Sequence, residues 1–300
     1  MPELPEVETT LRGIRGALQG ARIRLVVRER RLRWRIPAGL ERRVRGQTVA
    51  GMRRRGKYIL LVLERGALLI HLGMSGSFRV LTGAPAPAAH DHYDLVTDAG
   101  RIVRYRDPRR FGCLLWCGGE PLQHPRLRGL GVEPVATGET TDITVTTDIT
   151  VTTDATDTTD TTEESRAEFN GDYLRRVAAG RRITVKQFLM DSRVVVGVGN
   201  IYASEALFAA AIDPRRACHR VSAARYQKLA DATRAILRDA IRRGGSTIRD
   251  FAAADGRPGY FEQELKVYGR EGAPCARCGR AIRRAVIGQR STFYCPGCQR

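Results

Sequence analysis

The chain has 300 residues, enough for two domains that each bury a hydrophobic core. Its 51 Lys and Arg against 32 Asp and Glu give a formal net charge of +19, which favours nucleic acid as the partner, with an anionic membrane surface as the alternative. No apolar run approaches the ~18 residues of a transmembrane helix, and the amino terminus lacks the apolar segment of a secretory signal, so we expect a cytoplasmic protein.

The first six residues, MPELPE, are unusual in their chemistry. A small residue after the initiator is typical of chains that lose Met1, and this loss would leave Pro2 with a free α-amine. Such amines have pKa values near ~8, against ~10.4 for lysine, so part of the population is neutral at pH 7 and can attack an aldehyde-level carbon to give an iminium. Glu3 beside it could transfer a proton. The alternative is that Pro2 is only a terminus and Glu3 an acid at a helix start.

A helix is predicted next, with Pro5 in its first turn. Its buried face repeats at helical spacing and comprises Val7, Leu11, Ile14 and Leu18. Short apolar runs separated by turn residues then predict strands. These runs are Ile23–Val27, Tyr58–Leu63, Ala67–Leu72, Ser77–Leu81, Tyr93–Thr97 and Ile102–Tyr105. Strands at this spacing favour a β-sandwich or a barrel.

Residues 140–163 have a different composition from the rest of the chain. They form four hexads, TTDITV, TTDITV, TTDATD and TTDTTE. The wider stretch 137–165 has five Asp, three Glu and no Lys or Arg, so it has little to bury and is predicted to be a disordered linker between domains. The alternative to a disordered linker is a β-strand, because Ile and Val alternate with Thr in part of this stretch.

The pattern after this stretch is helical, with apolar clusters at Phe188–Met190 and Ile201–Phe208. Ser222 is the predicted N-cap of a further helix, which should end near Gly244. The apolar face of that helix comprises Tyr226, Leu229, Ile236, Leu237 and Ile241.

Four of the seven cysteines form two close pairs, Cys275 with Cys278 and Cys295 with Cys298. Two such knuckles can place four thiolates in a tetrahedron, which suits Zn²⁺ at ~2.3 Å. No ligand position is left open, so we predict one structural zinc that folds a hairpin too small to stand alone. The alternative, two vicinal disulfides, does not suit a reducing compartment.

Several motifs occur in order along the chain. They are MPELPEVET at 1–9, GKY at 56–58, HLGMSGS at 71–77, HDHYDL at 90–95, RYRDPRRFG at 104–112, VVGVGNIYASE at 195–205, PGYFEQEL at 258–265 and the CARC and CPGC knuckles. With these motifs the chain resembles bacterial formamidopyrimidine-DNA glycosylase, the 8-oxoguanine repair enzyme. The resemblance implies an α+β fold. Its expected parts are a helix and β-sandwich at 1–136, a linker at 137–165, a helix-two-turn-helix domain at 166–262 and a zinc finger at 263–300.

The resemblance also implies roles for single residues. Pro2 would be the nucleophile at C1′ of the damaged nucleotide, and Glu3 would assist opening of the sugar ring. Lys57 would donate a proton in β-elimination, and Arg290 would bind phosphate and act in δ-elimination. The implied DNA contacts are His90, Arg109, Arg181, Asn200, Met74 and Phe111. Three of these, Met74, Arg109 and Phe111, would fill the gap that a flipped base leaves, and a loop at 244–259 would close over that base.

The implied function is that of a bifunctional DNA glycosylase and AP lyase. It would excise oxidised purines from double-stranded DNA through a Schiff base and cut the strand by β,δ-elimination, as a monomer without a redox or nucleotide cofactor. It would associate with the bacterial nucleoid through DNA. One alternative is endonuclease VIII, which prefers oxidised pyrimidines and usually starts PEGPE rather than PELPE. Another is a non-catalytic DNA-binding zinc protein, against which Pro2, Glu3 and Lys57 together argue.

Overall fold

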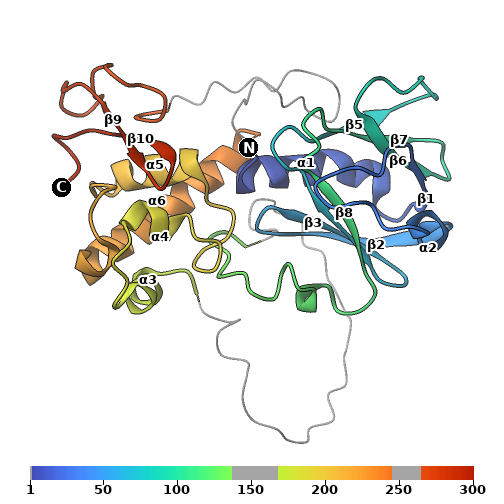
Figure 1. Cartoon of the computed structure of the whole chain (residues 1–300), viewed down its shortest axis with the longest axis horizontal. Helices are drawn as coiled ribbons and strands as arrows, with labels where there is room; N and C mark the ends of the chain where they lie inside the picture. The colour runs from blue at the N-terminus through green and yellow to red at the C-terminus, as the bar shows by residue number, and fades with distance from the viewer. Residues whose placement is uncertain (1, 137–167, 245–264) are drawn as a thin grey trace, which may run out of the picture.

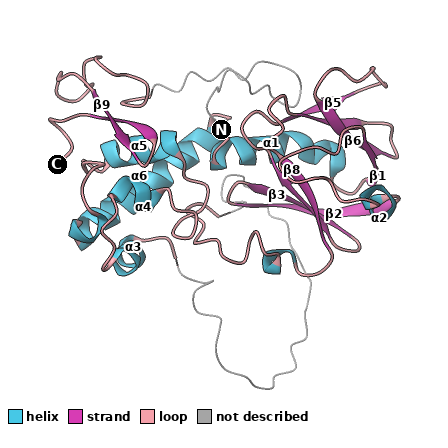
Figure 2. Ribbon diagram, viewed as in Figure 1, coloured by secondary structure: helices cyan, strands magenta, loops and turns pink. Residues whose placement is uncertain are grey.

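The computed structural model describes residues 2–136, 168–244 and 265–300 of the chain (Figure 1). Helix α1 (Leu4–Leu18) runs from the helical part of the molecule into the part that contains the large sheet. The two-stranded hairpin near the carboxyl terminus lies beside the helical part. Helices and strands are therefore segregated, and the α+β class is confirmed (Figure 2).

Helix α1 has the predicted start and the predicted buried face. The Glu6 carboxylate accepts the backbone N–H of Glu3 at 2.8 Å, and Pro5 lies in the first turn, where its missing N–H costs nothing. The predicted face is buried along its length and comprises Val7, Leu11, Ile14 and Leu18. These side chains belong to the core of the sheet part, whereas Leu4 belongs to the core of the helical part. One helix thus enters both cores.

The described residues form one eight-stranded antiparallel sheet in the order β5-β7-β6-β1-β2-β3-β4-β8. Its strands are β1 (Arg22–Val27), β2 (Gln47–Arg55), β3 (Tyr58–Leu63), β4 (Ala67–His71), β5 (Ser77–Leu81), β6 (Asp91–Thr97), β7 (Ile102–Arg106) and β8 (Cys113–Cys117). Strands β1 and β2 pair at only two positions, so the sheet divides there into halves. Both halves bury side chains in the core that α1 shares, which gives the predicted sandwich. Helix α2 (Leu40–Val44) packs against β1.

The six predicted strands are confirmed to within two residues at either end. Strands β2 and β8 were not predicted. Strand β2 contains Gly51 and a run of three arginines, Arg53 to Arg55, and such a run is typical of a solvated surface segment. The structure instead buries Arg54 within this strand.

The helical part contains α3 (Gly171–Ala178), α4 (Val185–Leu189), α5 (Asn200–Ala209) and α6 (Ala223–Arg242), and the hairpin contains β9 (Arg283–Ile287) and β10 (Arg290–Tyr294). Ser222 is the N-cap residue of α6 as predicted, although its side chain makes no capping bond. The helix ends two residues before Gly244. No described helix is both long enough and apolar enough to cross a membrane.

Backbone hydrogen bonds join the sheet part to the helical part. The N–H of Leu4 donates to the carbonyl of Gly197 at 3.0 Å. The segment that leaves the sheet part pairs with the chain before α5, where Val196 N–H donates to Val132 O at 3.0 Å and Gly131 N–H donates to Ser192 O at 2.8 Å. The predicted linker at 137–165 and most of the predicted loop at 244–259 lie outside the described residues, so the domain boundaries at 136, 165 and 262 stay predictions.

We expect Gly131→Ala to destabilise the protein. A Cβ at Gly131 would lie 2.3 Å from the backbone oxygen of Val194, so the two segments would have to separate, at a cost of about 1–3 kcal/mol. Gly129→Ala is the matched control, because a Cβ there meets no atom within 4 Å. Urea unfolding followed by circular dichroism measures both variants, and equal midpoints would contradict the close packing at Gly131.

Candidate active site

The carboxylate of Glu3 is buried at the amino-terminal end of α5. Its Oε2 accepts the N–H of Gly199 at 2.7 Å, and its Oε1 accepts the N–H of Ile201 at 3.0 Å. These amides are the free donors at the start of a helix, and the positive end of the helix dipole favours a negative charge there. Burial, the largest cause, raises the pKa of Glu3, while the Lys57 charge and the two amide bonds act in the opposite direction.

Two glycines of the VVGVGN motif permit this close approach. A Cβ on Gly199 would lie 2.4 Å from Cδ of Glu3. Gly197 has φ +83°, and a Cβ there would lie 2.5 Å from Cβ of Leu4. The glycine-rich stretch before α5 is therefore shaped to receive the first turn of α1.

A second buried carboxylate orients the start of the chain. Glu6 accepts the N–H of Glu3 through Oε2 and the hydroxyl of Tyr202 through Oε1, both at 2.8 Å. Pro2, one residue earlier, is also buried. The peptide that joins Pro2 to Glu3 is thus held between α1 and α5.

Lys57 is the second residue of the tight turn between β2 and β3. The turn is held by Glu133, whose Oε1 accepts the N–H of Gly56 at 2.6 Å. Burial is the main cause that lowers the pKa of Lys57, and the Arg290 charge lowers it further, whereas Glu3 and Glu6 raise it. Lys57 therefore interacts electrostatically with two other predicted catalytic residues, Glu3 and Arg290, which come from separate segments.

Arg54 explains how Glu133 is held in place. Its guanidinium is buried and donates to Glu8 Oε2 at 2.9 Å, to Glu133 Oε2 at 2.6 Å and to the carbonyl of Val135 at 3.0 Å. Removing one partner from such a buried pair typically costs about 3–5 kcal/mol, because a charge is left uncompensated. The network therefore stabilises the turn that presents Lys57.

Asn200 lies in a cluster that the sequence analysis missed. Its amide donates to Ser291 O at 2.9 Å, and its Oδ1 accepts a bond from Lys186 Nζ at 2.6 Å. Lys186 also donates to Thr292 Oγ1 at 2.7 Å, so one ammonium ties α4 and α5 to strand β10, which begins with Arg290. Burial lowers the pKa of Lys186 to about 8. A lysine two residues before the apolar cluster Phe188–Met190 was the available signal.

The predicted wedge residues lie on two loops that are tied together. Ser75, next to Met74, donates to Asp107 Oδ1 at 2.7 Å and accepts the N–H of Arg109 at 3.2 Å. The Arg109 guanidinium lies 5.2 Å from the centre of the Phe111 ring, and that ring is 42% exposed. An exposed aromatic ring beside an exposed guanidinium suits insertion between bases.

The two remaining predicted DNA contacts differ in position. His90 is exposed, and its carbonyl accepts the N–H of Asp107, which places it at the base of the wedge loop. Arg181 instead pairs with Asp191 at 3.6 Å and lies over the Phe188 ring at 5.8 Å. These contacts link Arg181 to α4 and to none of the other predicted site residues.

His71 is a further site residue that the sequence analysis missed, although it begins the HLGMSGS motif. Its Nδ1 accepts the N–H of Gly73 at 2.9 Å, so the proton of the neutral ring is assigned to Nε2. Burial lowers its pKa to about 4, and the charges of Lys57 and Arg33 act in the same direction. A neutral ring with a free N–H donor next to Lys57 suits a phosphate oxygen.

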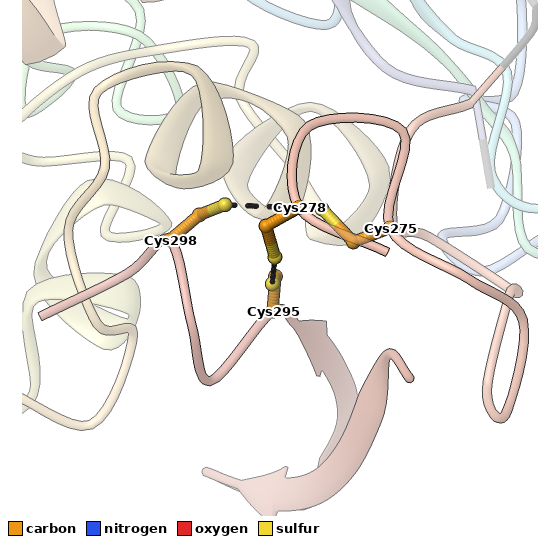
Figure 3. A group of neighbouring side chains, drawn as sticks. All are labelled: Cys275, Cys278, Cys295 and Cys298. Carbon is orange, nitrogen blue, oxygen red and sulfur yellow. Dashed lines mark hydrogen bonds between the residues drawn. The ribbon is translucent and has the colours of Figure 1, made fainter. Parts of the chain in front are cut away.

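The four predicted metal ligands converge around one point (Figure 3). Their sulfur atoms all lie within 4.8 Å of one another, with 3.9 Å between Cys275 and Cys298 and 3.4 Å between Cys278 and Cys295. A tetrahedron with ~2.3 Å zinc–sulfur bonds needs sulfur atoms ~3.8 Å apart. The residues therefore fit one zinc ion that joins the loops on either side of the β9–β10 hairpin.

Three family models match the chain. The formamidopyrimidine-DNA glycosylase N-terminal domain matches residues 1–114, the H2TH domain of the same enzymes matches residues 161–252, and a zinc finger found in FPG and IleRS matches residues 272–300. The last match agrees with the cysteine geometry, so the protein contains one structural zinc site.

Full-length relatives and solved structures are similar to the whole chain. The formamidopyrimidine-DNA glycosylase of Alkalilimnicola ehrlichii is 52% identical and that of Xanthomonas euvesicatoria 51%, with both chains of each pair fully covered. The MutM (Fpg) structure from Thermus thermophilus aligns at a TM-score of 0.79 with 34% identity, covering 99% of this chain and 98% of the other. Lactococcus lactis Fpg in complex with DNA containing an abasic site aligns at 0.81 with 28% identity, covering 99% of both chains.

We expect the stability of the protein to fall as pH decreases from 6.5 to 4. In this window the folded state binds fewer protons at His71 than the unfolded state does, so acid favours unfolding by about 3 kcal/mol at most. His71→Asn lacks this proton and should show a flatter dependence. Urea unfolding between pH 4 and 7 gives both curves, and parallel curves would contradict the lowered pKa.

We expect Cys295→Ser to lose zinc, to unfold the hairpin and to lose most of its DNA affinity, because Arg290 lies on that hairpin. Atomic absorption, far-ultraviolet dichroism and fluorescence anisotropy with labelled duplex measure these three effects. Cys117→Ser is the matched control, since this buried thiol lies outside the cluster and its bond to Gly119 O can be made by a hydroxyl. Zinc-free protein with full DNA affinity would contradict the structural role.

Proposed function

The chain belongs to the formamidopyrimidine-DNA glycosylase family, and we propose that it excises oxidised purines through a covalent intermediate on Pro2. It is a DNA glycosylase of DNA repair with the AP lyase activity that is characteristic of the family. The observation that most supports the Pro2 mechanism is the buried Glu3 carboxylate beside Pro2, which α5 holds within electrostatic reach of Lys57.

The first half of the proposed reaction replaces the base by the protein. Once Met1 is removed, the Pro2 nitrogen attacks C1′ of the flipped nucleotide, loses its proton and displaces the base, which leaves with its bonding electrons and is protonated. The nitrogen lone pair then expels O4′ of the sugar and forms the iminium. O4′ needs a proton at this point, and Glu3 is placed to give it, because its raised pKa brings the protonated carboxyl closer to neutral pH.

The second half cuts the strand. The iminium withdraws electrons from C2′, whose proton becomes acidic, and loss of that proton breaks the C3′–O3′ bond. The conjugated iminium that results makes the C4′ proton acidic, and loss of that proton forms a second double bond as the C5′–O5′ bond breaks and its phosphate leaves. Lys57 is our candidate for proton transfer in these steps because its lowered pKa brings its neutral and charged forms closer together in population. Arg290 would bind the phosphate that leaves.

The DNA is proposed to enter between the sheet part and the helical part. Met74 and Phe111 would fill the space that the flipped base leaves, and Arg109 would donate to the unpaired cytosine. His90 and Asn200 would contact the DNA backbone. Arg181 would contact it at a separate position, away from these two residues. We also propose that the protein acts as a monomer, since one chain supplies every group named here.

Purines are favoured over pyrimidines as the substrate. One solved Lactococcus lactis Fpg complex contains DNA with Fapy-dG. That enzyme is 27% identical to this chain, and the alignment covers 99% of this chain. The Asp107–Phe111 loop, DPRRF, also favours the purine enzyme over the related endonuclease VIII.

The proposal predicts that borohydride traps the protein on DNA with 8-oxoguanine opposite cytosine, and that the adduct lies on Pro2. Glu3→Gln should trap at least tenfold more slowly while it binds the same DNA with nearly unchanged affinity, because the amide keeps acceptor capacity but cannot give the proton. Single-turnover trapping and peptide mapping measure both effects. Thymine glycol is the control lesion and should trap less.

An adduct on a peptide centred on Lys57 would overturn the assignment of Pro2. Efficient trapping on thymine glycol alone would favour endonuclease VIII. Tight binding without any adduct would favour the non-catalytic zinc protein.

A further inference from the structure

A stack of one indole and two guanidinium groups lies beside the candidate active site. The Arg126 guanidinium is 3.9 Å from the centre of the Trp34 ring, and the Arg33 guanidinium is 4.8 Å from it. Trp34 is half-buried, whereas both arginines are exposed. Stacking on an aromatic face restricts a guanidinium without using its N–H donors, which stay free for an acceptor.

The position of this stack is set by the wedge loop and the sheet edge. The N–H of Arg33 donates to Gly112 O at 3.2 Å, next to Phe111. Tyr58 and His71, whose rings lie 4.9 Å apart, pair across β3 and β4 at the strand ends that follow Lys57. The charges of Arg33 and Arg126 both act on Tyr58, and that of Arg33 also acts on His71, so the stack adjoins both the wedge and the Lys57 turn.

The positive charge of the stack is not neutralised within the described residues. Neighbouring arginines in the same segment are paired, Arg28 with Asp94 and Arg30 with Glu41. In the part of the chain that the structure describes, no carboxylate lies within ion-pair distance of Arg33 or Arg126. Two fixed cations without a carboxylate partner suit an external anion of matching geometry, and phosphate binds the planar fork through two bonds.

We propose that Arg33, Trp34 and Arg126 form a second phosphate-binding site that holds the DNA backbone beyond the reacting nucleotide. This inference rests on the proposed function for the presence of DNA between the sheet part and the helical part. The site contacts phosphates rather than bases, so it adds affinity and register without sequence preference. It extends the phosphate-binding surface from Lys57 and His71 along the sheet part.

The test is the salt dependence of binding by the full-length protein. The probe is a labelled 21-base-pair duplex with a non-cleavable abasic analogue, followed by anisotropy from 50 to 200 mM salt. Each phosphate contact contributes about 0.9 to the slope of log K against log salt. Loss of two contacts in R33A/R126A should therefore make the fall in affinity over this range about tenfold smaller than in the wild type.

Two control variants separate a site from general charge. R33K/R126K keeps both charges and should keep the wild-type slope. R22A/R45A removes two exposed arginines, the first residue of β1 and the residue after α2, and should also keep the wild-type slope. Elements β1 and α2 lie at the end of the sheet part that faces away from the helical part (Figure 1). An unchanged slope in R33A/R126A, or an equal change in R22A/R45A or in R33K/R126K, would overturn the proposal.

Shortened duplexes locate the contact. As base pairs are removed from one end or the other, the wild type should lose affinity sharply at one length, and R33A/R126A should show no step there. A step of equal size in both proteins would also overturn the proposal. Borohydride trapping of the wild type on the full duplex tests the Pro2 chemistry separately. The Pro2 mechanism and the second phosphate-binding site can therefore fail independently of each other.

Discussion

The site depends on the insertion of a single carboxylate into the start of a helix 196 residues later in the chain. Glu3 accepts the amides of Gly199 and Ile201, and this contact joins the first turn of α1 to α5. A charge that is removed from water is tolerated only where donors replace the lost solvent. Glu3, its two amide donors and the glycines that admit it therefore form one unit. Any movement that separates α1 from α5 would expose that unit and leave the carboxylate without its partners.

A second buried ionic contact joins α1 to the segment that leaves the sheet part. Arg54 of β2 donates to Glu8 of α1 and to Glu133 of that segment, and Glu133 accepts the N–H of Gly56 in the turn that contains Lys57. The acid beside the chain start and the lysine of the turn are thus fixed by separate networks that meet at α1. Because each network has a buried charge, partial assembly is unfavourable, and the site is complete only when both parts of the protein are folded together.

How much could be predicted from the sequence differs between elements for physical reasons. Helix α1 and six strands follow from local apolar spacing, and the metal site follows from cysteine spacing. Strand β2 was missed because Arg54 is buried by acids 46 and 79 residues away, which no local pattern shows. Lys186 was missed because one of its partners lies 106 residues later. The roles assigned to single site residues came from the family resemblance and not from spacing.

The burial of Pro2 has a consequence for the order of events during synthesis. The proposed chemistry requires removal of Met1, and in the folded protein Pro2 is buried while Gly199 and Tyr202 bind the neighbouring carboxylates of Glu3 and Glu6. Chains grow at about 5–20 residues per second, so about 10–40 s pass between synthesis of Pro2 and synthesis of these two partners. In that interval the chain start has none of the contacts that later fix it. We therefore expect an aminopeptidase to remove Met1 during synthesis, before α5 exists to bind Glu3.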